Sequence, residues 1–200
     1  MRTVYDGPLT YGVNFDRYNN VTFFDQLDFI GIDAYFPLTN KNDPSLEELK
    51  EGWNQYVPEL EQLSLKYGKD IIFVEIGYRS ILGANKEPWN WQKKGIFNEH
   101  EQALCYEATF KTFENISWLK SFFWWNWEAI PGENDDKLDY TPYNKLAEQV
   151  LRHWYNGEPM PDLEKNNQIP VFIGISVITA SVMILAIYWV RKKGFKQKRS

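Results

Sequence analysis

The apolar run DIIFVEIG at Asp70–Gly77 limits the possible folds of this chain more than any other segment. Its length suits a β-strand, and such a nearly continuous apolar series is typical of a strand that is buried on both faces of a parallel sheet. Parallel neighbours cannot be joined by a tight turn, because the chain must cross from one end of the sheet to the other. The run therefore predicts an α/β fold.

Further strand-like and helix-like segments alternate along residues 1–156. Runs rich in β-branched and aromatic residues, bounded by turn residues, predict three more strands. These strands are Leu9–Phe15, Phe29–Phe36 and Ser121–Trp127. Apolar residues that recur at intervals of three and four predict helices between and after the strands. The helices are expected to start near Ser45, Asn98 and Thr141. This alternation supports parallel pairing of the strands.

The ends of the predicted helices carry known signals. Ser45 precedes the first helix and Glu48 lies three residues later, so the two can form a capping box. Gly68 and Gly157 follow the last apolar positions of the first and last helices, where a glycine commonly ends a helix. The helix that starts at Asn98 is expected to continue to Ile116.

Polar residues cluster where the predicted strands end. They are Asn14, Asp16, Asp33, Tyr35, Glu75, Tyr78, Asn126 and Glu128. The carboxyl ends of parallel strands meet at one edge of the sheet, which is where α/β proteins build their sites. Neither of the two glycine-rich phosphate-binding patterns, GxGxxG and GxxxxGK followed by Ser or Thr, occurs after a strand. A nucleotide site at this edge therefore loses its usual support.

Glu75 is the strongest candidate for a catalytic residue, because it interrupts an apolar strand. A buried ionised carboxylate is costly unless it is paired or used. One interpretation is a structural acid that bonds to a neighbour such as Arg79. The other is a nucleophile, since Tyr35 at the end of the preceding strand could donate a hydrogen bond that keeps the carboxylate ionised.

Tryptophans in the last predicted strand are the second signal. Because side chains alternate along a strand, Trp125 and Trp127 should share one side. Trp124 and Asn126 should take the other side. One or two of these indoles belong to the core, but an indole face at the edge of the sheet is well suited to stacking on the C–H face of a sugar ring. Other candidates for the same cleft lie in the loop after the third strand, namely Trp89 and Trp91.

Charge and composition exclude several classes of protein and site. Residues 1–168 carry all 27 acidic side chains and 16 of the 22 basic ones, so this region offers no basic surface for duplex nucleic acid. The single cysteine, Cys105, excludes an intramolecular disulfide framework and a cysteine-based zinc site. His100 and His153 are far apart in the sequence and leave little for a metal site.

The segment Ile169–Val190 contains 22 residues without an ionisable side chain. At about 1.5 Å per residue it would span roughly 33 Å as a helix, which matches a bilayer core. Six basic residues within 191–200 predict a cytoplasmic tail, which would place the acidic body outside the cell. The first residues show no signal-peptide pattern. Either the chain is tail-anchored with a cytoplasmic body, or its real N-terminus is missing.

Several segments together resemble the C-terminal half of glycoside hydrolase family 113, whose known members include β-mannanases. The segments are LTYGVNFD, FDQLDFIGIDAYFPLT, KDIIFVEIGYRS with the later EPWNW, FFWWNW, and YTPYNKLAEQVLRHWY. They occur in the same order over residues 1–156. The resemblance implies a partial (β/α)8 TIM barrel, strands five to eight, of the large retaining-glycosidase clan.

The resemblance also implies roles for individual residues. Glu75 would be the catalytic nucleophile at the end of strand seven, and Tyr35 the tyrosine that orients it. Either Trp125 or Trp127 would be the sugar-stacking tryptophan of strand eight. Further contacts with the substrate are expected from Asn14, Asp16, Asp33 and Trp89.

The resemblance leaves no residue for the acid/base glutamate, which the clan carries at the end of strand four. Retaining hydrolysis needs two carboxyl groups about 5–5.5 Å apart. Residues 1–158 are therefore expected to be half of a barrel that lacks its N-terminal partner half. The expected remaining parts are a linker at 159–168, a transmembrane helix at 169–190 and a basic tail at 191–200.

These features predict a membrane-anchored, β-mannanase-like glycoside hydrolase fragment for a β-linked poly- or oligosaccharide, inactive without the other barrel half. This interpretation implies neither a metal nor an organic cofactor. A second interpretation is a non-catalytic, membrane-tethered protein for carbohydrate binding or scaffolding. A third is that two half-barrels associate into one barrel, which would still lack the acid.

Overall fold

The computed structural model describes residues 3–127 and 136–164. The contacts divide the chain into Met1–Leu163 and Glu164–Ser200, and the fold below is that of the first unit. None of the helices within the described residues is long and apolar enough to cross a membrane. The predicted span at 169–190 and the basic tail at 191–200 lie outside the described residues.

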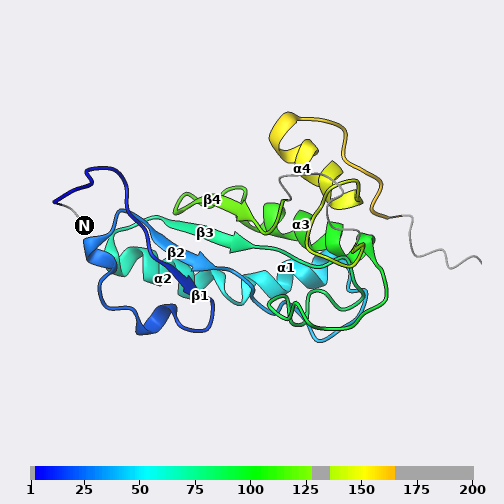
Figure 1. Ribbon diagram of the computed structural model, residues 1–200, viewed down its shortest axis with the longest axis horizontal. Helices are drawn as coiled ribbons and strands as arrows, with labels where there is room; N and C mark the ends of the chain where they lie inside the picture. The colour runs from blue at the N-terminus through cyan, green and yellow to red at the C-terminus, as the bar shows by residue number, and fades with distance from the viewer. Residues whose placement is uncertain (1–2, 128–135, 165–200) are drawn as a thin grey trace, which may run out of the picture. The chain divides into compact units, whose positions relative to one another are not determined.

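Four parallel strands form a sheet in the order in which they occur along the chain (Figure 1). The strands are β1 at Gly12–Asn14, β2 at Ile30–Asp33, β3 at Ile71–Ile76 and β4 at Leu119–Trp124. The α/β prediction is confirmed, although each strand is shorter than its apolar run. The difference is largest for β1 and β2, and β1 pairs with β2 at only three positions.

Helices connect and follow the strands. They are α1 at Leu46–Asn54, α2 at Val57–Tyr67, α3 at Glu99–Phe113 and α4 at Leu146–Asn156, and two short 3-10 helices at Tyr18–Asn20 and Phe24–Gln26 join β1 to β2. The single helix expected after Ser45 is in fact two helices, because Pro58 at the start of α2 has no N–H to continue the ladder. The last helix begins after Lys145 rather than at Thr141.

The predicted caps at Ser45, Gly68 and Gly157 are confirmed, whereas α3 ends at Phe113 and not at the predicted Ile116. Ser45 and Glu48 form the complete capping box at the start of α1. The side chain of Asn98 caps α3 by accepting a hydrogen bond from the Glu101 backbone N–H. Gly68 and Gly157 end α2 and α4 with φ values of 60° and 71°, a left-handed conformation that costs glycine little.

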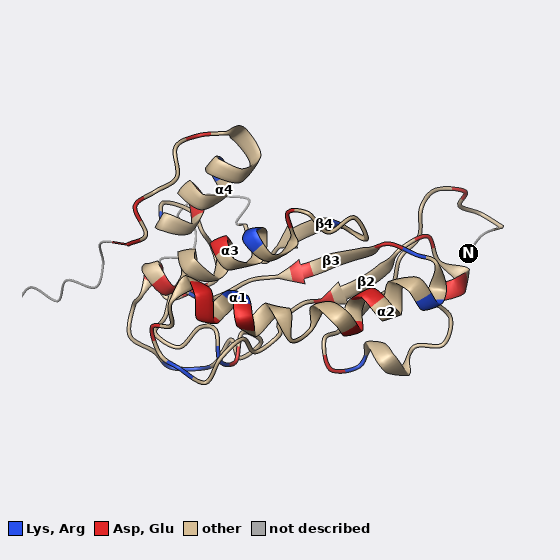
Figure 2. Cartoon of the chain, turned by 180° about the vertical axis from the view of Figure 1, so that it is seen from behind, with Lys and Arg blue, Asp and Glu red and all other residues tan. Residues whose placement is uncertain are grey.

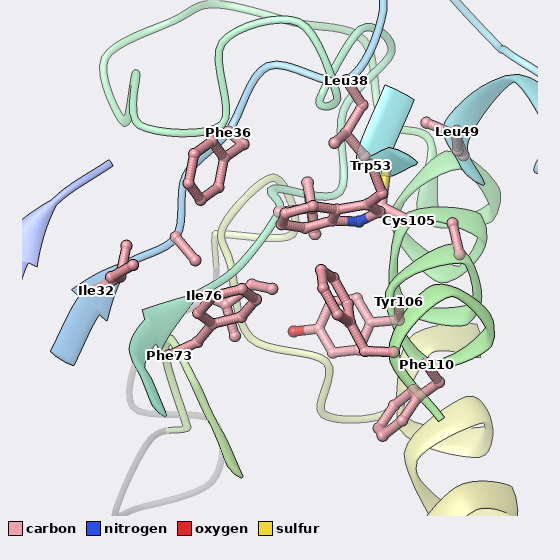
Figure 3. Packing of buried hydrophobic residues seen from close by; sticks show 14 of the residues in the cluster. Ile32, Phe36, Leu38, Leu49, Trp53, Phe73, Ile76, Cys105, Tyr106 and Phe110 are labelled. Atoms are coloured by element: carbon pink, nitrogen blue, oxygen red, sulfur yellow. The ribbon is translucent and has the colours of Figure 1, made fainter. Parts of the chain in front are cut away.

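The core lies between the sheet and its helices. Helices α1 and α2 run behind the strands in Figure 1 and in front of them in Figure 2, where acidic residues occur along α1, α2 and α3. Figure 3 shows Trp53 of α1 between the β2–β3 side chains and those of α3. Trp53 is fully buried, stacks on Phe73 with ring centroids 5.9 Å apart, and donates from its Nε1 to Thr109 Oγ1 at 3.1 Å.

The opposite face of the sheet is more open. Ile72 and Val74 of β3 are only half-buried, and Phe123 of β4 is 56% exposed. This arrangement of four parallel strands, with helices on one side and an open apolar face on the other, is consistent with part of a TIM barrel.

We predict that Trp53→Ala lowers the free energy of unfolding by about 3–5 kcal/mol, because it removes a buried indole and leaves a cavity beside Phe73. Urea denaturation measures the change. Leu65→Ala on α2 is the matched control, since Leu65 is 74% exposed and its loss should cost less than about 0.5 kcal/mol. Equal losses for the two variants would contradict the packing described above.

Candidate active site around Glu75

A β-bulge in β3 turns Glu75 away from the helices. In a regular strand Glu75 would lie on the same side as Ile71 and Phe73, both of which are fully buried. The register of β3 against both neighbours shifts after Phe73, and the next buried residue is Ile76 rather than Glu75. The extra residue re-aims the side chains that follow it, so Glu75 stays half-buried at the open side of the sheet.

Tyr35 donates a hydrogen bond to Glu75. The distance from its hydroxyl oxygen to Glu75 Oε2 is 2.9 Å, so the bond expected from the sequence is present. Burial of the phenol, and then the neighbouring Glu75 carboxylate, raise the pKa of Tyr35 far above its ordinary value. Tyr35 therefore keeps its proton and acts as a donor throughout the neutral range.

A cavity of about 490 Å³ surrounds this pair. It is lined by Tyr35, Glu75, Arg79, Trp89, Trp91, Trp125, Asn126, Asp136, Asp139 and Tyr140. Glu75 belongs to β3, and the other lining residues come from the segments that follow β2, β3 and β4 at the carboxyl ends of the strands. Such a cavity combines large aromatic surfaces with carboxylate, amide and hydroxyl groups, which together suit a polar ligand with apolar faces.

The cavity distinguishes Trp125 from Trp127, the two candidates for the sugar-stacking tryptophan. Trp125 lines the cavity and is 45% exposed. Trp127 lines a different cavity, of about 480 Å³, beside α4. Trp124 is partly buried, stacks on the core residue Tyr106 with ring centroids 4.0 Å apart, and lines the same cavity as Trp127.

The alternation expected beyond Trp124 is wrong for Asn126. The strand ends at Trp124, and Trp125 and Asn126, joined by a cis peptide bond, both line the cavity of Glu75. Because the alternation of side chains depends on extended strand geometry, it stops where the ladder stops.

Asp33 lies next to Glu75 in the sheet but does not line the cavity. The two residues are register partners in β2 and β3. Burial, and then the negative charge of Glu75, raise the pKa of the Asp33 carboxyl. The two carboxyl groups are therefore close enough for the charge of Glu75 to disfavour ionisation of Asp33.

Asn14 and Asp16 are not brought to the cavity of Glu75. Asn14 Nδ2 donates to Asp16 Oδ1 at 2.8 Å, and both residues are exposed, Asn14 as the last residue of β1 and Asp16 beyond it. Asp16 lines a separate cavity of about 280 Å³. Trp89 and Trp91, by contrast, line the Glu75 cavity, as the sequence predicted.

Four residues of the cavity were not predicted as ligand contacts. These are Arg79, Asp136, Asp139 and Tyr140. Arg79 was considered only as a partner of Glu75, but its guanidinium donates to the Lys93 carbonyl and lies 4.0 Å from Asp136. Arg79 comes shortly after the strand end, and Tyr140 is the first residue of the segment YTPYNKLAEQVLRHWY that carries the resemblance. Asp136 and Asp139 come from a loop with no distinctive pattern.

Tyr140 joins two walls of the cavity. Its hydroxyl donates to the Pro88 carbonyl at 2.6 Å, next to Trp89. Burial raises the pKa of Tyr140 to about 12, although Arg79 opposes the rise. The loop after β3 is thereby attached to the loop after β4.

A buried carboxylate supports the loop that carries the tryptophans. Glu101 of α3 is fully buried and accepts hydrogen bonds from the backbone N–H groups of Gly83 and Asp43 and from the side chain of Asn85. Asn85 in turn accepts two bonds from Thr39. Because an unsatisfied buried charge is costly, this network holds the loops after β2 and β3 in one arrangement.

The described residues contain no cluster of three or more His, Cys, Asp or Glu side chains that could hold a metal ion. Cys105 is buried, and burial raises the pKa of its thiol. The functional groups that line the cavity are carboxylate, phenol, amide, guanidinium and indole.

Comparison with known proteins identifies a similar family. The sequence model of Glycoside Hydrolase Family 113 matches residues 1–145. A solved GH113 β-mannanase from Alicyclobacillus acidocaldarius, in complex with ManMIm, is 31% identical with a TM-score of 0.66; the match covers 78% of this chain and 47% of that one. A GH113 β-1,4-mannanase structure is 29% identical with a TM-score of 0.67, over 78% and 48% of the two chains.

More distant matches share the fold. A Faecalibacterium prausnitzii β-glucuronidase is 19% identical with a TM-score of 0.53, over 78% of this chain and 26% of that one. The comparison with curated proteins finds no match. The chain spans about half the length of the solved β-mannanase structures that it matches.

We predict that Asp33→Asn raises the midpoint of thermal unfolding at pH 7. A raised folded-state pKa means that ionised Asp33 destabilises the fold at high pH. The gain should disappear below about pH 4, where the carboxyl is protonated in both folded and unfolded chains. Thermal scans at both pH values measure this difference. Asp6→Asn, which changes an exposed aspartate, should show no such dependence, and a gain for Asp33→Asn that is the same at both pH values would contradict the prediction.

Proposed function

The chain belongs to Glycoside Hydrolase Family 113, and from this membership we propose that it provides the nucleophile-bearing part of a retaining glycoside hydrolase. The substrate we propose is a β-linked, mannan-type poly- or oligosaccharide. The observation that carries the proposal is the hydrogen bond from Tyr35 to Glu75, at 2.9 Å, inside a cavity lined by tryptophans.

In this mechanism Glu75 attacks the anomeric carbon and forms a covalent glycosyl-enzyme, which water later hydrolyses. The oxygen of the departing sugar must receive a proton in the first step, and the incoming water must lose one in the second. Tyr35 orients the attacking carboxylate through its hydrogen bond and, with its raised pKa, keeps its own proton. Orientation of this kind reduces the entropic cost of the attack.

We propose that the proton donor comes from the other half of the barrel. The remaining acidic residues of the cavity are Asp136 and Asp139, which form ion pairs with Arg79 and Lys145. The Lys145 Nζ to Asp139 Oδ1 distance is 2.7 Å, and both side chains are largely buried. Both aspartates thus stabilise the loops through their ion pairs, which leaves Glu75 as the carboxylate suited to act on the sugar.

The proposed sugar contacts follow from the exposed groups of the cavity. Trp125 and Trp89 are 45% and 41% exposed, so each can offer an indole face to a sugar ring. Asn126 can donate and accept hydrogen bonds with ring hydroxyls. Because sugar hydroxyls are neutral, this combination suits an uncharged hexose polymer.

A non-catalytic carbohydrate-binding protein is the alternative proposal. It is favoured by the fact that Trp89, Trp91 and Trp125 all line the cavity, whereas the second carboxylate of a retaining pair is not identified among the described residues. The two proposals differ in whether Glu75 reacts with a sugar.

Anchoring in a membrane is also part of the proposal. The support is the run of 22 residues without charge at Ile169–Val190, followed by six basic residues. This arrangement would place the barrel half outside the cell, with a cytoplasmic C-terminus.

We predict that the chain reacts once with 2,4-dinitrophenyl β-mannoside, because this leaving group departs without a proton donor. The expected result is a burst of dinitrophenol and a mannosyl adduct on Glu75, detected by mass spectrometry. Glu75→Gln should abolish both. Tyr35→Phe should slow the burst by about 10–100-fold, the value of a hydrogen bond to a charged group.

Trp127→Ala is the matched control for this experiment, because Trp127 lies outside the Glu75 cavity and its loss should leave the burst unchanged. A wild-type chain that binds the mannoside but never forms the adduct would support the non-catalytic alternative.

We predict for the anchor that the full chain stays with membranes after alkaline extraction, whereas residues 1–168 are released. Release of both forms would refute the membrane proposal. A variant with three lysines within 169–190 controls for nonspecific association with membranes, since charge at the centre of a span opposes insertion and this variant should be released.

A further inference from the structure

Helix α4 runs beside α3 in the same direction. At the start of both helices, the Leu146 backbone N–H donates to the Glu99 carboxylate at 3.0 Å. Near the end of both helices, the rings of Trp154 and Phe110 stack with centroids 5.0 Å apart. Since α3 follows the carboxyl end of β3, both helices start at the edge of the sheet that holds the Glu75 cavity, and α4 leads the chain away from that edge.

The segment Gly157–Leu163, called the return segment below, brings the chain back to that edge (Figure 1). His153, near the end of α4, donates to the Glu158 carbonyl at 2.6 Å. At the other end of the segment, His100 in the first turn of α3 donates to the Leu163 carbonyl at 2.6 Å, and the Leu163 side chain packs against the core. The chain therefore reaches Leu163 beside the loops that form the cavity.

The uncharged run Ile169–Val190 begins shortly after the return segment. Because a residue spans at most about 3.3–3.6 Å, residues 164–168 place the start of this run within about 20 Å of Leu163. This limit comes from covalent geometry alone. The edge of the sheet that holds the Glu75 cavity is therefore tied closely to the proposed membrane span.

The loop after β3 exposes large apolar side chains at the same edge. Trp91, Ile96 and Phe97 are 69%, 73% and 46% exposed. Lys94, which is also exposed, lies between them in the sequence. Exposed aromatic and aliphatic side chains beside a lysine are typical of surfaces that enter the headgroup region of a bilayer. These four residues are called the loop surface below.

Backbone contacts hold the loop surface in its exposed position. The Leu82 backbone N–H donates to the Ile96 carbonyl at 2.8 Å, and Phe97 pairs with Ile81 in an antiparallel bridge. Ile96 and Phe97 cannot turn inward without breaking these contacts. Removing apolar surface from water is favourable in proportion to the area covered, so these side chains favour a partner with an apolar surface.

We propose that the loop surface rests in the headgroup region of the bilayer that holds the anchor. The inference rests on the proposed membrane anchor, which the return segment directs to this edge of the sheet. Trp91 belongs to the loop surface and also lines the Glu75 cavity. The cavity therefore opens at the membrane surface, and the substrate class is a mannan-type glycan whose own end is held at that surface.

The test places an NBD fluorophore on the full chain in phosphatidylcholine vesicles, at Ile96→Cys or at Leu65→Cys. Leu65 is as exposed as Ile96 but lies near the end of α2, at the opposite edge of the sheet, and the native Cys105 is buried and stays unlabelled. Lipids with a nitroxide near the headgroup should quench most of the emission of the Ile96 label, because interfacial side chains enter about 5–10 Å into the headgroup and acyl boundary. The Leu65 label should keep its emission.

Phe97→Glu, in the chain labelled at Ile96, tests the loop surface itself. The introduced charge should remove most of the quenching, because it opposes burial among lipids. Phe23→Glu is the matched control, since Phe23 is exposed to a similar extent outside the loop surface, and it should leave the quenching unchanged. If Phe97→Glu keeps the full quenching, the tether alone brings the label to the lipid and the proposal is refuted.

The remaining outcomes are equally decisive. Equal quenching of the Ile96 and Leu65 labels, or quenching of the Leu65 label alone, would overturn the proposal. An unquenched Ile96 label would also overturn it and would leave the loop surface to another occupant, such as the other barrel half. A chain that does not float with the vesicles refutes the anchor and this inference together, whereas a mannosyl adduct on Glu75 would still support the proposed catalytic function.

Discussion

The register shift in β3 is the constraint on which the rest of the site depends. The buried residues of β3, which are Ile71, Phe73 and Ile76, face the helices. The extra residue between Phe73 and Ile76 allows Glu75 to point away from that face. A strictly alternating strand would place an ionisable carboxylate against the aromatic core around Trp53, where it would be unpaired and costly. One extra residue thus converts a destabilising position into one where Tyr35 can bond the carboxylate.

Around this carboxylate, the loops are arranged by buried polar groups that belong to no strand. Glu101 and Asn85 connect the loops after β2 and β3, and Tyr140 connects the loops after β3 and β4. Lys145 adds a further link by donating to Ser80 and Asp139. The sheet therefore sets where the loops begin, while these contacts set where Trp89 and the other cavity residues lie.

Much of the fold was predictable from local patterns, since the capping box at Ser45, the glycines that end α2 and α4 and the apolar stripes all depend on near neighbours in the sequence. The site was predictable only in part. Glu75 lies near the end of β3 and Tyr35 follows its neighbour β2, so their meeting follows from parallel topology. Trp127 and Asp16 follow strands too, yet they line other cavities, because the chain direction beyond a strand end is set by tertiary contacts.

The sequence by itself determined the α/β class, the pairing of Tyr35 with Glu75 and the separation of an acidic body from an uncharged segment and a basic tail. Those features depend on the composition and periodicity of continuous segments. Only the tertiary structure decided which tryptophan accompanies Glu75, that Asn126 shares its cavity, and that Asp16 lies at a separate cavity. The physical reason is that a bulge, a broken ladder and a buried ion pair arise from contacts between segments that are distant in the sequence.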